Sequence, residues 1–188
     1  YFNERLSDPL CSEEPLELSI DIRLQHILNQ ELNNYMEKFS AKGGAGLILD
    51  AKTGEVLALS SLPDFDPNEN NDPTDPSRFN QILQGVYELG SGFKTFTIAS
   101  GLESNVVDLG GGYDASKPVR VSGFTIHDDH AKNRWLSVPE IYVYSSNIGT
   151  LKMAQEIGVD GQKEFFEKLG LFRKTDIEIH EKGNPILP

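Results

Sequence analysis

The chain has 188 residues, of which 38% are hydrophobic, so it is long enough to bury the core of one soluble domain of ordinary size. Its formal net charge of −12, without a basic cluster, argues against nucleic acid as a partner, and its apolar runs are too short for a transmembrane helix. The single cysteine, Cys11, excludes an internal disulfide.

The N-terminal part of the chain predicts a linker followed by a helix. Residues 1–15 are polar and end in a proline, which is typical of a linker that enters a domain from an upstream one. Asp21 can cap a helix, and the apolar residues after it recur at helical spacing. We therefore expect this helix to run to about Lys42.

A β-hairpin and an irregular loop are expected next. Residues 45–50 and 55–60 are apolar and partly β-branched, and the four residues between them end in Gly54, which suits a turn position with positive φ. Residues 62–77 contain four prolines among aspartates and asparagines, so we expect a loop without regular structure there.

The rest of the chain predicts helices separated by short strands or loops. Helical spacing of apolar residues indicates helices from Phe79, from Gly90 through Leu102, after Ser137, at about 146–157 and at about 161–169. Pro139 supports the third of these, because proline is common in the first turn of a helix. Residues 113–126 are expected to form short strands or loop.

Ser91 and Lys94 are candidates for a catalytic pair. A serine hydroxyl is a poor nucleophile at neutral pH and needs a base nearby, and positions i and i+3 lie on the same face of a helix. Lysine acts as a base only if its pKa is lowered, to which desolvation against Phe93 and Phe96 can contribute. Taken alone, the same pattern is also explained by a helix-capping serine followed by a solvated lysine.

Two further features favour the catalytic interpretation. Gly90 and Gly92 flank Ser91 and leave room for a substrate backbone, while a helix N-terminus there offers N–H groups to a developing oxyanion. Ser145 and Asn147 form a Ser-x-Asn element, whose hydroxyl can pass a proton to a leaving amine and whose amide can hold a peptide group. Ser-x-x-Lys followed by Ser-x-Asn is the order found in β-lactamases and penicillin-binding proteins.

On these residues the sequence resembles the transpeptidase domain of class B penicillin-binding proteins, most closely the septal type of Gram-negative bacteria. Four segments carry the resemblance: residues 18–23, 46–58, 87–97 and 144–150. It implies an α/β (α+β) fold of the serine β-lactamase and D,D-transpeptidase type, present here as the helical subdomain plus an N-terminal β-hairpin of an incomplete sheet. Residues 16–188 would then form a partial transpeptidase domain.

The resemblance also implies a role for each candidate residue. Ser91 would be the nucleophile that forms an acyl-enzyme, and Lys94 the general base that activates it. Ser145 would relay the proton, and Asn147 would bind substrate and also contact Lys94. The implied reaction is D,D-transpeptidation of peptidoglycan without a metal or cofactor: D-alanine leaves, and an amine of a neighbouring stem peptide resolves the ester.

The partners and location implied by the resemblance are those of septal wall synthesis. The expected ligands are peptidoglycan stem peptides and β-lactam antibiotics, which would acylate Ser91, and the expected protein partners are membrane proteins of the division machinery. The location would be the periplasmic side of the bacterial inner membrane, with the membrane anchor outside these residues.

The sequence departs from the family pattern at two points. Gly92 stands where the family commonly has threonine or another small polar residue, which loosens the start of the helix. No Lys-Thr-Gly follows Asn147: Lys52-Thr53-Gly54 lies in the expected hairpin turn, and Lys174-Thr175-Asp176 has the wrong third residue.

We therefore expect these 188 residues by themselves to be catalytically incompetent. In the family, the strand that carries Lys-Thr-Gly supplies an oxyanion N–H and the lysine that receives the substrate carboxylate. A fluorescent penicillin that labelled Ser91 in the isolated chain as fast as in the full-length protein would refute this expectation.

Three other interpretations stay open from the sequence. Residues 127–130, His-Asp-Asp-His, could be read as a metal site, although they lack the i, i+4 histidine spacing of a helix. The same fold could instead catalyse hydrolysis, as in D,D-carboxypeptidases and serine β-lactamases. A non-catalytic β-lactam sensor or structural module would also keep Ser-x-x-Lys, and only turnover of a peptide substrate would separate it from an enzyme.

Overall fold

The chain divides into two compact units. The computed structural model describes residues 17–66, 68, 72 and 74–186. One unit comprises Tyr1–Val86 with Lys174–Asn184, and the other Tyr87–Arg173 with Pro185–Pro188. The predicted linker and Cys11 lie outside the described residues, and the division into a linker and a partial domain stays a prediction.

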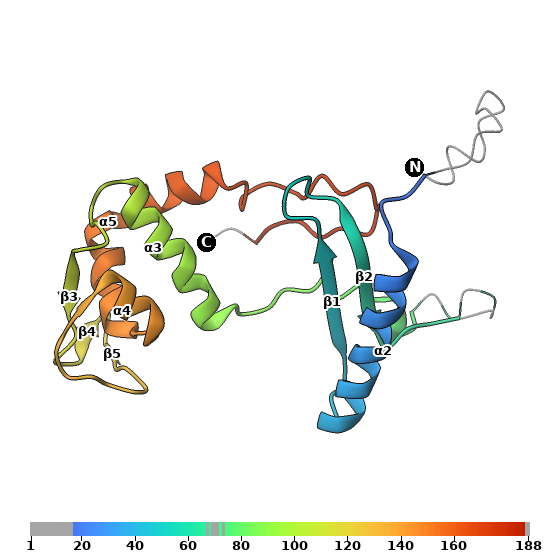
Figure 1. The fold of residues 1–188 in the computed structure, drawn as a ribbon, viewed down its shortest axis with the longest axis horizontal. Helices are drawn as coiled ribbons and strands as arrows, with labels where there is room; N and C mark the ends of the chain where they lie inside the picture. Colours follow the sequence, from blue (N-terminus) through green and yellow to red (C-terminus); the bar gives the residue numbers. More distant parts are fainter. Residues whose placement is uncertain (1–16, 67, 69–71, 73, 187–188) are drawn as a thin grey trace. The chain divides into compact units, whose positions relative to one another are not determined.

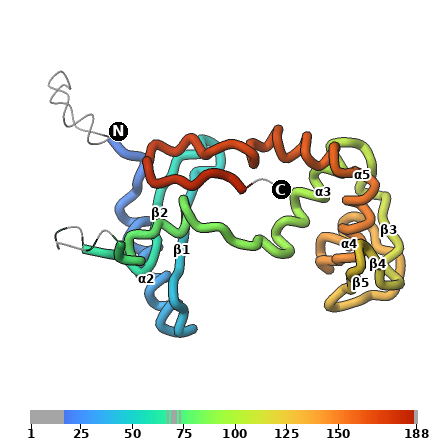
Figure 2. The backbone as a smooth tube through the Cα atoms, turned by 180° about the vertical axis from the view of Figure 1, so that it is seen from behind, coloured from blue at the N-terminus to red at the C-terminus, as the bar shows by residue number. Residues whose placement is uncertain are grey.

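The first unit is built from a helix that lies along a β-hairpin (Figures 1 and 2). Helix α2, Ile22–Phe39, begins at Asp21, whose carboxylate accepts hydrogen bonds from the first backbone N–H groups, as predicted. It ends at Ser40, which adopts a left-handed φ of 50°, slightly before the predicted end. The side-chain amide of Gln25 pairs with both the N–H and the carbonyl of Leu59, at 2.9 and 2.8 Å, and so fixes the helix on the hairpin.

The predicted hairpin is confirmed. Strands β1, Gly44–Leu49, and β2, Val56–Leu62, pair antiparallel. The carboxylate of Asp50 accepts hydrogen bonds from the N–H groups of Lys52 and Thr53, and Gly54 has a φ of 79°. The upstream Lys-Thr-Gly is thus part of a turn, and its glycine is required by the backbone conformation.

The helix predicted from Phe79 is wrong. The structure has a short 3₁₀ helix, η1, at Pro76–Arg78, and then a single turn in which the Gln84 N–H donates to the Asn80 carbonyl. Ser61 on β2 explains the difference, because its hydroxyl donates to the Phe79 carbonyl at 3.2 Å and accepts from the Gln81 N–H at 3.0 Å. These contacts with β2 hold the segment in a conformation that local periodicity does not reveal.

The second unit carries the remaining elements and two small sheets, with β3 paired to β6 and β4 to β5. In chain order the elements are η2 Gly90–Phe93, α3 Lys94–Glu103, β3 Gly112–Asp114, β4 Val119–Val121, β5 Phe124–Ile126, β6 Trp135–Ser137, α4 Val138–Val143 and α5 Asn147–Lys168.

Two predicted features of the last helices are present in the structure. Gly158, with a φ of 76°, kinks α5 into the two helical segments that were predicted. Ser137 and Glu140 form a capping box at the start of α4, with proline in the first turn as expected.

The core of this unit brings α3 against α5. Its buried residues are Ile98, Ala115, Leu136, Val138, Ile141, Ile148 and Met153. Gly101 on α3 allows the close approach, because a β-carbon there would lie 2.9 Å from the Met153 sulfur. The N-terminal ends of α3 and α5 each carry candidate site residues, so this packing positions the site.

Candidate active site

The ammonium group of Lys94 is the centre of the candidate site. Lys94 is the first residue of α3, and its Nζ donates to Ser91 Oγ at 3.2 Å, to Ser145 Oγ at 2.8 Å and to the Ser145 carbonyl at 2.6 Å. The two elements that the sequence places about fifty residues apart therefore meet at one nitrogen. The arrangement offers a path for a proton between two serine hydroxyls.

Ser91 is an exposed residue of the 3₁₀ turn η2, directly before α3. In a 3₁₀ turn, side chains three residues apart lie nearly above one another, which brings the Ser91 hydroxyl to Lys94. Neither η2 nor α3 has a side-chain hydrogen bond at its N-cap, and these N-caps are Leu89 and Phe93. The alternative interpretation of Ser91 as a helix-capping serine is therefore wrong.

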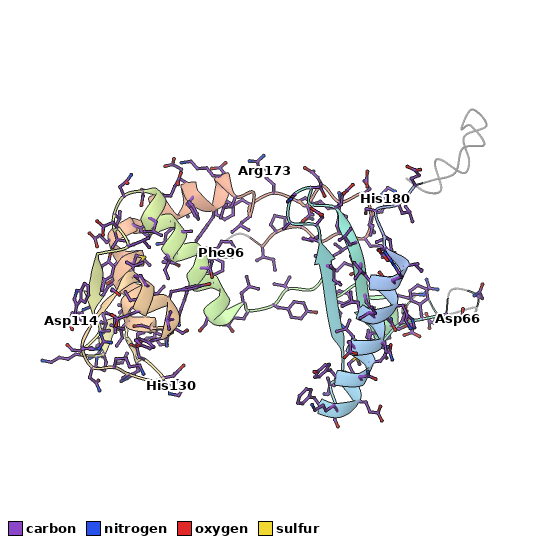
Figure 3. The ribbon with its side chains drawn as sticks, in the orientation of Figure 1. Asp66, Phe96, Asp114, His130, Arg173 and His180 are labelled. Carbon is purple, nitrogen blue, oxygen red and sulfur yellow. The ribbon has the colours of Figure 1, made fainter. Side chains whose placement is uncertain are left out.

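The environment of Lys94 changes its pKa. Partial burial lowers the pKa of the ammonium group below 10.5, while the negative charges of Asp128 and Asp129 act in the opposite direction. Phe93 and Phe96 flank it in sequence, with ring centroids 5.4 Å apart, and Figure 3 labels Phe96 on α3. The predicted lowering of the Lys94 pKa is confirmed, and the charged groups that act on Lys94 are both carboxylates.

Ser145 lies in the turn between α4 and α5 with an unusual backbone. Its φ is 54°, a left-handed conformation that costs a residue other than glycine on the order of 1–3 kcal/mol. Its N–H donates to the Tyr142 carbonyl at 3.1 Å. This conformation lets both the hydroxyl and the carbonyl of the same residue accept hydrogen bonds from Lys94.

Asn147 is the first residue of α5, and its side-chain amide donates to the His127 carbonyl at 2.9 Å. Among the described contacts, no hydrogen bond joins Asn147 to Lys94, although the resemblance led us to expect that contact. Both residues line a cavity of about 410 Å³. Its other lining residues are Thr125, Ile126, His127, Thr150, Leu151 and Ala154.

Residues 127–130, which were considered above as a metal site, form the start of the loop after β5. In the part of the chain that the structure describes, no three His, Cys, Asp or Glu side chains gather in a way that would hold a metal ion. Figure 3 labels His130 on the loop between β5 and β6. Asp128 instead accepts hydrogen bonds from the start of α5, a role that the sequence reasoning missed because no spacing rule links a loop carboxylate to a helix eighteen residues later.

The two glycines beside Ser91 differ in conformation, and this predicts opposite effects of substitution. A β-carbon at Gly92 would meet no heavy atom within 4 Å, whereas Gly90 has a left-handed φ of 54°. Gly92→Ala should raise the free energy of unfolding by about 0.5–1 kcal/mol by reducing the freedom of the unfolded chain. Gly90→Ala should lower it by about 1 kcal/mol. Denaturant unfolding of both variants tests this, and shifts of the same sign would contradict it.

A family profile and curated proteins match most of the chain. The profile described as "Penicillin binding protein transpeptidase domain" matches residues 44–187. The "Probable peptidoglycan D,D-transpeptidase FtsI" of Caulobacter vibrioides is 40% identical over 174 residues, which are 93% of this chain and 30% of that protein. The "Peptidoglycan D,D-transpeptidase FtsI" of Escherichia coli is 29% identical over 173 residues, which are 92% of this chain and 29% of that protein.

Solved structures match the fold as well. A "peptidoglycan glycosyltransferase from Burkholderia ambifaria" is similar with a TM-score of 0.79 and 29% identity, over 92% of this chain and 50% of that one. The transpeptidase domain of "Burkholderia pseudomallei penicillin-binding protein 3" is similar with a TM-score of 0.76 and 29% identity, over 90% of this chain and 48% of that one. The chain thus spans about 30% of the two curated relatives and about half of these structures. The predicted fold class is confirmed.

Proposed function

Because the chain belongs to the family of penicillin-binding protein transpeptidase domains, we propose that it forms part of a serine D,D-transpeptidase that cross-links peptidoglycan stem peptides. The observation that supports this most is the position of Lys94 Nζ, within hydrogen-bond distance of both Ser91 Oγ and Ser145 Oγ. A nucleophile, a base of lowered pKa and a proton relay are the groups that acyl transfer through an ester requires.

In the proposed mechanism the substrate is the D-Ala-D-Ala end of a stem peptide. Lys94, as the free amine, takes the hydroxyl proton while Ser91 Oγ attacks the carbonyl carbon of the terminal amide. The proton passes through Ser145 Oγ to the nitrogen of the leaving D-alanine as the C–N bond breaks, which leaves an ester on Ser91. An amine of a second stem peptide then attacks the carbonyl carbon of the ester and gives up a proton to Lys94. The C–Oγ bond breaks, and Lys94 returns this proton to Oγ, which restores the serine hydroxyl.

Asn147 and the cavity beside it would hold the substrate chain. Among the described contacts, the side-chain hydrogen bond of Asn147 uses its nitrogen, so its amide oxygen can accept from a peptide N–H. The cavity is lined by β5 and by the first turns of α5, next to Lys94. A peptide lying along these elements would reach Ser91 without crossing the core.

The finer assignments rest on the sequence resemblance. We propose a role in septal wall synthesis on the periplasmic side of the inner membrane, together with membrane proteins of the division machinery and with β-lactams as inhibitors. Among the described residues, none of the helices has the length and apolar character needed to cross a bilayer.

A turnover assay tests the proposed reaction. The full-length protein is incubated with a pentapeptide donor ending in D-Ala-D-Ala and a D-amino acid as the amine acceptor, and products are identified by mass spectrometry. Transfer of the donor to the acceptor with release of D-alanine is expected. Release of D-alanine with water as the only acceptor would assign the carboxypeptidase class instead, and acylation without turnover would indicate a sensor.

A further inference from the structure

Asp128 caps the helix that begins with Asn147. Its Oδ2 accepts a hydrogen bond from Ser146 Oγ at 2.8 Å, and its Oδ1 accepts from the Ile148 N–H at 2.9 Å. Backbone N–H groups at the start of a helix lack partners within the helix, and a negative charge there is favourable. The cap of α5 is thus completed by a carboxylate from the loop after β5.

The hydrogen bond to Ser146 fixes a side chain that is almost fully buried. Ser146 is 1% exposed, and its hydroxyl accepts from the Gly149 N–H at 2.9 Å while it donates to Asp128. Removing Asp128 would leave a buried hydroxyl proton without its acceptor, which is costly in the interior of a protein. Ser146 stands directly between Ser145 and Asn147.

The same loop segment also holds the residue that follows Ser146. The Asn147 amide donates to the carbonyl of His127, the residue before Asp128. Ser145 has a left-handed backbone, which persists only when its surroundings enforce it. Residues 127 and 128 therefore hold the residues that directly follow Ser145, whose hydroxyl and carbonyl accept hydrogen bonds from Lys94.

We propose that Asp128 is a positioning residue for acyl transfer, which holds the turn of residues 145–147 in the geometry that places Ser145 Oγ on Lys94. This inference rests on the proposed function, because it assigns Asp128 a role in that reaction. Asp128 itself touches neither Ser91 nor Lys94 through a hydrogen bond in the described structure; it acts through Ser146 and the α5 backbone.

The pKa of Lys94 provides a readout that separates a positioning effect of Asp128 from the effect of its negative charge. Asp128 and Asp129, both on the loop after β5, raise the Lys94 pKa against the effect of burial, and His127 lines the cavity with Lys94. Of the described hydrogen bonds to the turn, none comes from the Asp129 side chain. Asp129→Asn therefore removes a similar charge without removing a cap, which makes it the matched control.

The experiment measures the rate of acylation of the full-length protein by a fluorescent penicillin as a function of pH. Asp128→Ala should lower the rate at the high-pH plateau on the order of 10²-fold, which is the cost of a misplaced catalytic group. Asp128→Asn keeps one of the two accepting oxygens, so its acylation rate should fall less than that of Asp128→Ala. Asp129→Asn should keep the wild-type plateau. Both asparagine variants should shift the acid limb to lower pH, because losing a negative charge lowers the Lys94 pKa.

The outcomes distinguish this inference from the proposed function. A wild-type protein that is not acylated at Ser91 would overturn the proposed function. If the wild type is acylated, either of two results would overturn the positioning role. One is an acylation rate of Asp128→Asn that equals the wild-type rate at the high-pH plateau, and the other is a loss of rate in Asp129→Asn as large as that in Asp128→Asn. Because Asp128→Asn is nearly isosteric, it decides the matter even if Asp128→Ala does not fold, and its thermal unfolding is measured in parallel.

Discussion

Replacing Ser91 by alanine is expected to abolish acylation by a penicillin. Ser91 is exposed, lies between two glycines and accepts a hydrogen bond from Lys94. Its hydroxyl is therefore the group that an incoming carbonyl carbon can reach. Without it, no ester can form at this position, whatever the state of Lys94. The full-length Ser91→Ala protein is incubated with a fluorescent penicillin, and labelling is read after denaturing electrophoresis.

Ser100→Ala provides the matched control on helix α3. The Ser100 hydroxyl is buried and has no hydrogen-bond partner among the described residues, so its removal relieves an unsatisfied polar group. This variant should label at the wild-type rate and be at least as stable. Peptide mapping of the labelled wild type should place the adduct on the peptide that contains Ser91. Persistent labelling of Ser91→Ala would assign the nucleophile to another residue.

The sequence predicted those parts of the fold that local signals determine. Asp21 is a helix cap, Gly54 is a turn residue, and Ser137 begins α4, and each is explained by hydrogen bonds or φ values within a few residues of chain. The Ser-x-x-Lys spacing predicted the contact of Ser91 with Lys94 for the same reason. Short-range geometry is sufficient at these positions.

The features that were missed depend on contacts between distant segments. Ser61 on β2 prevents the helix expected from Phe79, and no periodicity within residues 79–89 reveals that contact. From the sequence, Asp128 was considered only within an alternative metal-site interpretation, and its role as a cap at the start of α5 is visible only in the fold. The left-handed Ser145 is also absent from local signals, since glycine or asparagine would be expected at such a position.

Two of these missed features, the left-handed Ser145 and the cap by Asp128, belong to the same turn of the candidate site. A strained Ser145, a buried Ser146 and a carboxylate from a separate loop each conflict with simple local rules, and together they hold one turn against Lys94. Disagreement between sequence rules and structure is expected where a protein maintains a functional geometry at the expense of stability. The turn before α5 is such a place.

Replacing Lys94 is expected to remove both most of the rate and the pH dependence of acylation. In the wild type the pKa of Lys94 lies below 10.5 because of burial, so the rate should rise with pH as the ammonium group loses its proton. Lys94→Met removes the base, and Lys94→Arg keeps a charge that does not deprotonate in this range. Both should acylate about 10²–10⁴-fold more slowly, without the acid limb of the wild type.

The lowered pKa also predicts the direction of a change in stability. Between the folded-state pKa and 10.5, the unfolded chain binds more protons at Lys94 than the folded chain does, so the wild-type free energy of unfolding should rise with pH across this window relative to Lys94→Met. Lys132→Met is the control for removing a cation as such: the Lys132 ammonium lies 4.5 Å from the Tyr144 ring centroid and, among the described contacts, has no hydrogen bond to Ser91.

For the acylation rate, an acid limb that persisted in Lys94→Met would show that another group is the base. In that case the hydrogen bonds of Lys94 to Ser91 and Ser145 would serve only to hold the two hydroxyls in place.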